Sequence, residues 1–196
     1  MIDRSNYFQT LIKDVMDNSE SEYWEDAVTE WEIVDVEEDE RLEESCICGK
    51  EHLRYLFTIK NQLNGNELYP IGSSCIKKFE RDDLKHLVDV REQLFKLLHA
   101  VEDNQYLQLS SEFFSRKLLR YLLDIGAFEP NQWNNYNPEN DYRFMLDMFN
   151  KRTRTDKQNK KATAIILGSI KPFLQIELAG KIKKGNYIPV YTRHNM

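Results

Sequence analysis

The sequence has few of the features that mark a secreted or membrane-spanning protein. Only 3 of its 196 residues are cysteine, and this odd number argues against a framework of disulfide bonds. No uninterrupted apolar run approaches the roughly 20 residues that a membrane-spanning helix requires. The first residues, MIDRSNYFQTLIKDVMDN, lack the basic flank and the apolar stretch of a signal peptide. We therefore expect a cytoplasmic protein that has no membrane partner.

The sequence motifs of several large enzyme classes are also missing. The chain contains no G-x-x-x-x-G-K-[ST] phosphate loop, no G-x-G-x-x-G and no G-x-S-x-G. Its 4 histidines are few for a metallohydrolase, which usually combines several of them with carboxylates. The chain also lacks the H-x-E and P-C-x-x-C motifs that zinc deaminases require. These absences favour a protein that is not an enzyme.

Charge is unevenly divided along the chain. Residues 1–45 contain 16 acidic and 3 basic side chains, whereas residues 46–196 contain 17 acidic and 24 basic ones. The asymmetry is strongest over residues 151–184, where 10 basic residues accompany only Asp156 and Glu177. Such a division often marks an interaction surface, although a solvated face or charge pairing within the protein is the commoner reason for a charge run.

The spacing of apolar residues predicts both strands and helices. Strands are expected over residues 30–37, over 53–60 and over NELYPIG, where Pro70 favours an edge position. The turn NQLNG joins the last two strands into a hairpin. The segment FEPNQWNNYNPEN is predicted to be a polar loop, and the C-terminal KIKKGNYIPVYTRHNM is expected either to add a strand or to stay loose. Helices are expected over residues 5–17, 82–102, 111–125, 138–150 and 156–170, with Pro172 kinking or ending the last one.

The three cysteines are spaced as metal ligands would be. Cys46 and Cys48 lie one residue apart in CICGKEH and are poor disulfide partners, and Cys75 lies in IGSSCIKKF. Three thiolates and one imidazole form a common tetrahedral zinc site, which leaves no open position for chemistry. We predict one structural Zn²⁺ bound by Cys46, Cys48, His52 and Cys75, with His86 as the alternative fourth ligand. The competing interpretation is that the cysteines are ordinary small residues and that His52 simply begins a strand.

The order of these features is that of a treble clef: a cysteine knuckle, a hairpin, and then a cysteine at the start of a helix. The predicted fold class is therefore α+β, with a small antiparallel β-hairpin, treble-clef-like zinc module followed by a helical bundle. We expect residues 1–80 to hold the N-terminal helix, the acidic segment and the zinc-knuckle module. Residues 81–196 are expected to form the helical region with its basic C-terminal part, and the two regions can also pack as one compact unit.

The segment CICGKEHLRYLFTIKNQLNGNELYPIGSSCIKKF resembles a zinc-knuckle segment in uncharacterised proteins of phages and mobile elements of Gram-positive bacteria. The shared pattern is C-x-C-G, a hairpin that reads roughly F-x-I-x-N, and then G-S-x-C-I-x-x-F. The resemblance covers residues 46–79. It implies metal ligands at Cys46, Cys48 and Cys75, with His52 as the fourth, and a setting in the cytoplasm of a bacterial host cell. It implies no activity.

The first functional hypothesis is binding to nucleic acid or to a host protein that is bound to nucleic acid. Basic residues in NKRTRTDKQNKK could neutralise phosphates around a loop and the first turns of a helix, with the helix N-terminus assisting. The sequence pI of about 5.4 is far below that of a typical nucleic-acid-binding protein. A solvated basic helix end that faces the acidic segment is the competing interpretation. The candidate residues are Lys77, Lys78, Lys151, Arg152, Arg154, Lys157, Lys160 and Lys161.

The second hypothesis is a phage-encoded inhibitor of a host defence nuclease, of the CRISPR-effector or restriction-enzyme type. Such a protein would present carboxylates to the basic nucleic-acid groove of the nuclease, with Trp24 and Trp31 as anchors. The competing interpretation is that acidic loops keep a protein soluble and that Trp31 packs in the sheet. The candidate residues are Glu37, Glu38, Asp39, Glu40, Glu43 and Glu44.

Overall fold

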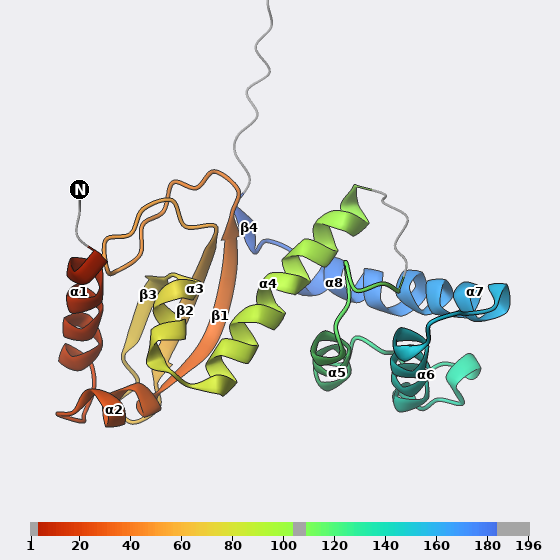
Figure 1. The fold of residues 1–196 in the computed structure, drawn as a ribbon, viewed down its shortest axis with the longest axis horizontal. Helices are drawn as coiled ribbons and strands as arrows, with labels where there is room; N and C mark the ends of the chain where they lie inside the picture. Colours follow the sequence, from red (N-terminus) through yellow and green to blue (C-terminus); the bar gives the residue numbers. More distant parts are fainter. Residues whose placement is uncertain (1–3, 104–108, 184–196) are drawn as a thin grey trace, which may run out of the picture. The chain divides into compact units, whose positions relative to one another are not determined.

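A computed structural model of the chain describes residues 4–103 and 109–183 (Figure 1). The fold is mixed α+β, as predicted. Its contacts divide the described residues into two compact units. We call residues 4–75 together with 181–183 the sheet unit, and residues 76–180 the helical unit. The predicted domain boundary lies after residue 80, whereas the contacts divide the chain after Cys75 and return residues 181–183 to the first unit.

The sheet unit is built on a sheet with the strand order β3-β2-β1-β4. The predicted hairpin of β2 with β3 is present, and β1 also pairs with β2, both in the antiparallel direction. The short strand β4 pairs with β1 in the parallel direction, which the predicted antiparallel module did not include. Residues 184–196 of the tail lie outside the described residues. The strands are β1 (Trp31–Asp39), β2 (Tyr55–Asn61), β3 (Glu67–Ile71) and β4 (Ile182–Lys183).

A bulge in β1 decides which of its side chains are buried. Trp31 and Ile33 point into the core, but the register with β2 shifts between Ile33 and Asp35. The extra residue, Val34, is therefore exposed, and the alternation resumes with Val36 buried. A bulge changes the face to which every later residue of a strand points. This shift determines where the acidic end of β1 lies.

Short helices complete the sheet unit. Helix α1 (Arg4–Asp17) buries Leu11 and Val15, as its helical spacing predicts, and α2 (Trp24–Ala27) is followed by the 3-10 turn η1 (Val28–Glu30). Trp31 is fully buried, and its indole N–H donates a 2.9 Å hydrogen bond to Ser19 Oγ. This polar contact satisfies the one polar atom of the largest core side chain.

Glu30 is a buried carboxylate that ties the connection after α1 to the end of β2. It accepts hydrogen bonds from the backbone N–H groups of Glu20 (2.9 Å) and Ser21 (2.8 Å) and from Asn61 Nδ2 (2.6 Å). Burial by itself would raise the pKa of Glu30, but these hydrogen bonds to Ser21, Glu20 and Asn61 outweigh it and lower the pKa to about 2. The folded state therefore favours the ionised form of Glu30.

The low pKa of Glu30 predicts a pH dependence of stability. A carboxylate whose pKa is lower in the folded state stabilises the protein above its unfolded-state pKa of 4.5, and this contribution is lost as the pH falls toward 2. We expect Glu30→Gln to lower the free energy of unfolding at pH 7 by about 1–3 kcal/mol. Thermal unfolding between pH 7 and pH 2 should show the gap between wild type and variant closing as the pH falls. Glu22→Gln, which changes an exposed carboxylate nearby, is the control, and a gap that stays constant with pH would contradict the assignment.

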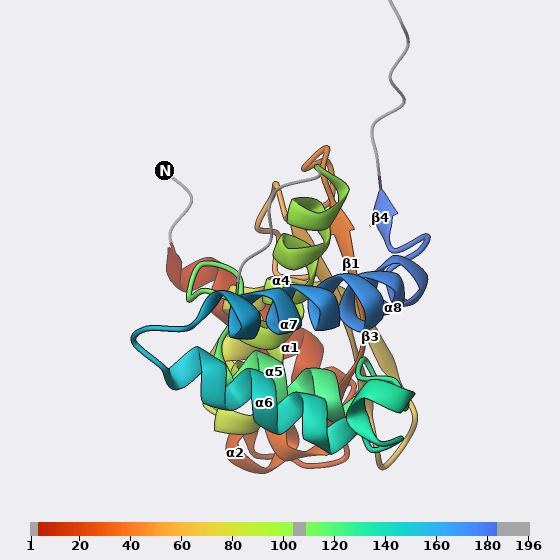
Figure 2. The ribbon, with the colours of Figure 1, turned by 90° about the vertical axis from the view of Figure 1, so that its right-hand side faces the viewer.

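The helical unit matches the predicted helices closely. Helices α4 (Asp82–Glu102) and α6 (Pro138–Asn150) have the predicted bounds. Helix α5 (Arg116–Asp124) begins later than predicted, because Ser115 Oγ accepts the N–H of Leu118 and so caps the helix there. Helix α5 packs on α4 and α6, and α6 lies alongside α7 (Figure 2). The remaining elements are α3 (Ser73–Ile76, at the junction of the units), η2 (Lys77–Phe79), η3 (Gln132–Asn134), α7 (Asp156–Ile165), the π-helical turn η4 (Ile166–Ile170) and α8 (Lys171–Glu177).

Of the two outcomes predicted at Pro172, a kink or an end of the helix, the end is wrong, because the helical run continues past this residue. The α-helical pattern stops at Ile165, continues as the π-helical turn η4 and resumes as α8, with Pro172 in the first turn of α8. A proline is tolerated in a first turn because its missing N–H is not needed there. Within residues 4–103 and 109–183, none of the helices combines the length and the apolar character that crossing a bilayer requires.

Candidate metal centre and basic surface

The three cysteines meet at one point in the structure. Cys46 and Cys48 lie in the connection from β1 to β2, and Cys75 lies on α3. Their Sγ atoms all lie within 4.8 Å of one another, with Cys46 to Cys75 at 3.6 Å and Cys75 to Cys48 at 3.3 Å. All three side chains are buried and none forms a disulfide. A tetrahedral zinc with Zn–S bonds near 2.3 Å places its sulfurs about 3.8 Å apart, so this arrangement needs little adjustment to bind one.

The backbone holds the cysteine cluster in place. Cys46 N–H donates to Lys50 O (2.8 Å) and Gly49 N–H donates to Cys46 O (2.7 Å), which closes a tight knuckle. Gly49 has φ +90°, a conformation that strains any residue with a side chain. On the other side, Gly72 N–H points at Cys46 Sγ (3.3 Å) and Gly72 O accepts the N–H of Cys75 (2.9 Å). Backbone N–H groups that point at sulfur favour the thiolate form, which is the form that binds metal.

Close packing of three thiols spreads their pKa values apart. The hydrogen bond from the Cys75 thiol outweighs burial and lowers the pKa of Cys46 to about 6, with the Gly72 N–H assisting. The same hydrogen bond, together with burial, raises the pKa of Cys75, and burial raises that of Cys48. The cluster alone therefore accommodates one negative charge. A divalent cation would allow the other two thiols to ionise, because a bound metal deprotonates its thiol ligands.

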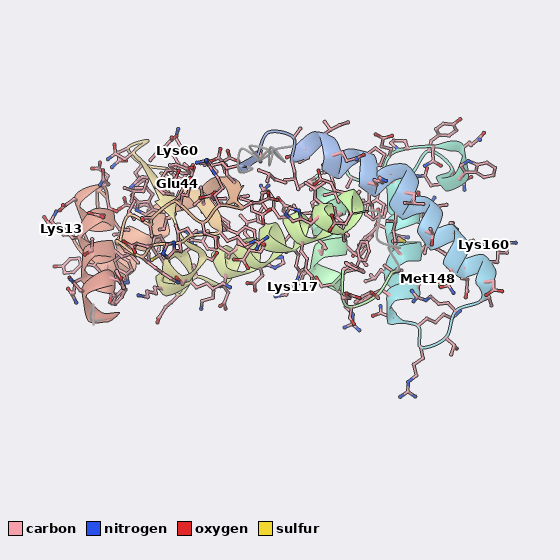
Figure 3. The ribbon with its side chains drawn as sticks, turned by 90° about the horizontal axis from the view of Figure 1, so that it is seen from above. Lys13, Glu44, Lys60, Lys117, Met148 and Lys160 are labelled. Carbon is pink, nitrogen blue, oxygen red and sulfur yellow. The ribbon has the colours of Figure 1, made fainter. Side chains whose placement is uncertain are left out.

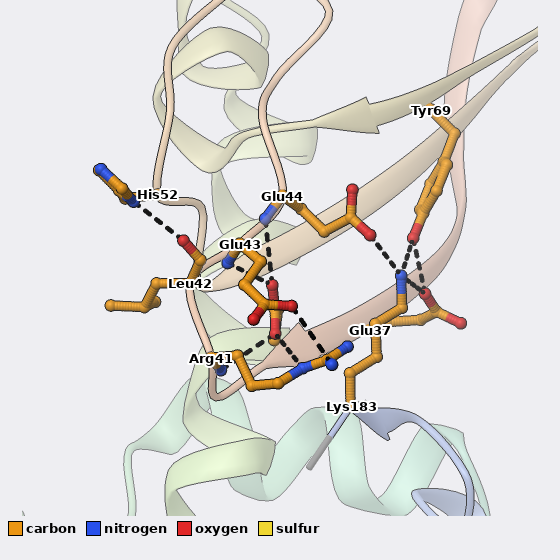
Figure 4. A network of polar contacts seen from close by, with 9 residues as sticks. Glu37, Arg41, Leu42, Glu43, Glu44, His52, Tyr69 and Lys183 are labelled. Atoms are coloured by element: carbon orange, nitrogen blue, oxygen red, sulfur yellow. Dashed lines mark hydrogen bonds and ion pairs between the residues drawn. The ribbon is translucent and has the colours of Figure 1, made fainter. Parts of the chain in front are cut away.

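The two candidate fourth ligands lie outside the cluster of three sulfurs. His52 is exposed, has φ +61°, and its Nδ1 lies 2.9 Å from Leu42 O (Figure 4). A carbonyl can only accept, so Nδ1 is the donor in this contact and Nε2 is the ring nitrogen left to bind a metal. Histidines that bind zinc commonly donate their second N–H to a backbone carbonyl in this way. His52 also lines a cavity of about 200 Å³ with Ser73 and Ser74, which directly precede Cys75.

His86 belongs to the helical unit, on α4. Its Nδ1 is buried and has no hydrogen-bond partner in the part of the chain that the structure describes. The structure therefore brings together three of the four predicted ligands, and the fourth stays a prediction, with His52 favoured by its contact to Leu42 and its place beside Ser73 and Ser74.

The acidic residues at the end of β1 do not form the predicted partner-facing surface. Glu38 and Asp39 are 0% exposed: after the bulge at Val34, Glu38 points to the same face as the buried Val36, whereas Asp39 is covered by the turn that follows β1. Arg54 Nε pairs with Glu38 at 2.8 Å. The carboxylate of Asp39 accepts the backbone N–H groups of Arg41 (3.0 Å), Glu43 (2.9 Å) and Glu44 (3.2 Å). These two carboxylates stabilise the fold, and a partner protein cannot contact them because they are not exposed.

The other acidic candidates are largely engaged within the sheet unit. Lys183 Nζ on β4 lies 3.4 Å from Glu37, 3.3 Å from Glu44 and 2.8 Å from the hydroxyl of Tyr69 (Figure 4). Glu43 pairs with Arg41 at 3.2 Å, and Glu40 is exposed.

The predicted tryptophan anchors are also engaged. Trp31 is buried in the core, where the competing interpretation placed it. Trp24 packs edge-on against Phe8 with ring centroids 6.0 Å apart.

The predicted basic residues divide into two groups. Lys77 pairs with Asp89 at 2.8 Å, Lys78 is half-buried, and Arg154 donates to Leu109 O at 2.7 Å. The others lie exposed at the end of α6, in the following turn and on the first turns of α7, and Lys160 projects outward from α7 (Figure 3). We call this second group the basic turn: Lys151, Arg152, Lys157, Lys160 and Lys161.

The charges of the basic turn are not neutralised locally. Among the described residues, no carboxylate forms an ion pair with any of its five cations. Lys161 Nζ lies over the ring of Phe144, 4.4 Å from its centroid. The N-terminus of α7 is already capped by Thr155 and Gln158, and Asp156 adds a negative charge there. Side-chain cations, rather than the helix end, therefore provide the positive potential.

One feature of the helical unit has no counterpart in the predicted sites. The loop FEPNQWNNYNPEN borders a cavity of about 670 Å³, and Trp133 in this loop is 81% exposed. The signal in the sequence was an aromatic residue among asparagines, where no core position explains it.

No protein-family model, curated protein or solved structure matches this chain.

Proposed function

We propose that this chain is a non-enzymatic, zinc-stabilised binding protein of a phage or mobile element, which acts on nucleic acid or on host machinery bound to nucleic acid. The basic turn is the observation that carries the proposal. Five exposed cations at one end of the helical unit lack an ion-pair partner among the described residues, so the electrostatic free energy of that surface is lowered by an external anion. A polyphosphate chain is the anion that matches a row of cations best.

The metal centre supports the non-enzymatic part of the proposal. Cys46, Cys48 and Cys75 fit a zinc ion, and with an imidazole as the fourth ligand the coordination is complete. A closed site binds no water or substrate, so the metal would hold the knuckle to α3 and supply no reaction.

The alternative proposal, an inhibitor of a host nuclease, draws less support from the same residues. Glu38 and Asp39 are buried, and Glu37 and Glu44 pair with Lys183. Glu40 and Glu43 remain as the exposed carboxylates of that predicted face. Binding to plain nucleic acid separates the two proposals, because only the first one requires it.

The proposal predicts binding that weakens steeply with salt. If all five cations of the basic turn contact phosphates of a single strand, log K should fall with log salt concentration with a slope of about −3.5. Fluorescence anisotropy with labelled single-stranded and duplex oligonucleotides, between roughly 50 and 200 mM salt, measures this slope. Absence of binding at the lowest salt concentration would contradict the proposed function.

A further inference from the structure

The cavity of about 670 Å³ in the helical unit has the size of a small-ligand site. Its apolar wall comes from Ala164, Ile165 and Gly168, at the end of α7 and in η4. Its polar side chains come from the loop before α6, from α6 itself and from the α7–η4 segment. They are Glu129, Asn131, Trp133, Asp141, Lys161 and Ser169.

Trp133 is held in an exposed position by a rigid loop. Asn131 Oδ1 accepts the N–H groups of Trp133 (2.8 Å) and Asn134 (3.2 Å), while Asn134 Oδ1 accepts the N–H of Asn131 (2.9 Å). Asn134 Nδ2 also donates to Glu129 O at 2.8 Å. The fold thus fixes the backbone under an indole that it leaves 81% exposed. An exposed aromatic ring on a fixed backbone can stack on a planar ligand at little cost in conformational entropy.

Asp141 supplies an acceptor inside the cavity. The residue is only 3% exposed, and Asn134 Nδ2 donates to its Oδ2 at 2.8 Å. Its Oδ1 has no hydrogen-bond partner within the described stretches of the chain. This oxygen is not one of the buried atoms that lack a partner, so it is open to the cavity, where it can accept an N–H group from a ligand.

Lys161 connects the cavity to the basic turn. It lines the cavity, and it follows Lys157 by one helical turn, about 6 Å along α7. A nucleic-acid strand whose phosphates contact the cations of α7 could therefore place a neighbouring base against Trp133. Duplex bases are not accessible to such a cavity, whereas the bases of a single strand can be splayed out and stacked.

We propose that this cavity binds one amino-bearing base (cytosine, adenine or guanine) of a single-stranded nucleic acid, with Trp133 stacking on the base and Asp141 accepting its amino N–H. This inference rests on the proposed function and deepens it. Thymine and uracil offer only an N3–H that lies between two carbonyl oxygens, and these oxygens repel the carboxylate, so both bases pair with Asp141 less well than an amino-bearing base does. The cations of the basic turn hold the flanking phosphates.

Oligonucleotides that differ only in the base test the inference. The probes are dC12 and dT12, which have equal length and charge, and a duplex of the same length. Wild type should bind dC12 at least roughly fivefold more tightly than dT12, as expected for the low end of a specific base contact. Trp133→Ala should weaken dC12 binding roughly 5- to 100-fold, the range measured for base stacking, while Trp133→Phe keeps most of the affinity and duplex binding is unchanged.

A second variant tests the role of Asp141. In Asp141→Asn, the amide oxygen can keep the bond from Asn134 while its NH₂ faces the cavity, so the preference for dC12 over dT12 should disappear without loss of thermal stability. Equal binding of dC12 by wild type and Trp133→Ala, with the basic-turn variants still weakened, would overturn this inference and leave the proposed function intact. Failure of wild type to bind any of the probes would overturn the proposed function itself. Free cytidine monophosphate that binds as tightly as dC12 would overturn the assignment to a strand.

Discussion

Replacing Cys46 by serine is expected to abolish zinc binding and to remove the cooperative unfolding transition of the sheet unit. Cys46 Sγ accepts the N–H of Gly72 and lies 3.6 Å from Cys75 Sγ, so replacing this residue removes one of the three sulfur ligands from the centre of the cluster. Structural zinc contributes about 10–16 kcal/mol in small zinc-finger peptides, which equals the whole stability of many domains. Elemental analysis and thermal unfolding of protein purified without added metal measure both effects.

Ser74→Ala is the matched control for Cys46→Ser. Ser74 is exposed on α3 and directly precedes Cys75, so this change should leave both the zinc content and the unfolding transition unaltered. A chelator added to wild type should reproduce the behaviour of Cys46→Ser and should not affect the variant further. Full zinc content in Cys46→Ser would mean that the cysteine cluster is not the metal centre.

Reversing the charge of Lys157, Lys160 and Lys161 to Glu is expected to weaken nucleic-acid binding by roughly 100-fold or more, without regard to base sequence. These side chains are exposed and lack ion-pair partners among the described residues, so their reversal removes contacts to phosphate and leaves no internal charge unpaired. The slope of log K against log salt concentration should become shallower by about 2. Anisotropy titrations at several salt concentrations give both numbers.

Lys13→Glu, Lys60→Glu and Lys117→Glu together form the control with the same change in net charge. Lys13 pairs with Asp17, Lys60 pairs with Glu67, and all three lie on other elements than the basic turn (Figure 3). Equal weakening by both triple variants would show that net charge, and not the basic turn, governs binding. An inhibitor of a host nuclease would tolerate the basic-turn reversals and would lose activity when Glu40 and Glu43 are neutralised.

The regular elements could be predicted because local pattern and burial agree in them. The apolar stripe of residues 82–102 and the Asn137-Pro138 start of α6 gave helix bounds that the structure reproduces. The spacing of Cys46 and Cys48 before a hairpin, with Cys75 after it, was sufficient to predict that the three sulfurs meet.

The role of individual charges could not be predicted, because it depends on contacts between distant residues. The bulge at Val34 decides that Glu38 points to the same face as Val36, and the alternation of residue types in the sequence does not predict this bulge. Arg154 reaches the carbonyl of Leu109, which is 45 residues away in the sequence. Lys183 meets Glu37 only because the chain returns to β1 after the whole helical unit.

The cavity beside Trp133 could not be predicted from the sequence for a similar reason. Its walls come from a loop, from α6 and from the π-helical turn after α7, and the position of that turn depends on packing rather than on a local motif. The sequence showed an aromatic residue in a polar loop, but only the fold places the buried Asp141 beside it.

X-ray absorption at the zinc edge, on protein purified without added metal, tests the metal centre most directly. A closed Cys₃His site predicts three sulfur neighbours at about 2.3 Å and one nitrogen at about 2.0 Å. Loss of the nitrogen neighbour in His52→Ala would identify the fourth ligand. Absence of zinc, or a first shell in which oxygen from water takes the fourth position, would contradict a structural metal and would reopen the question of catalysis.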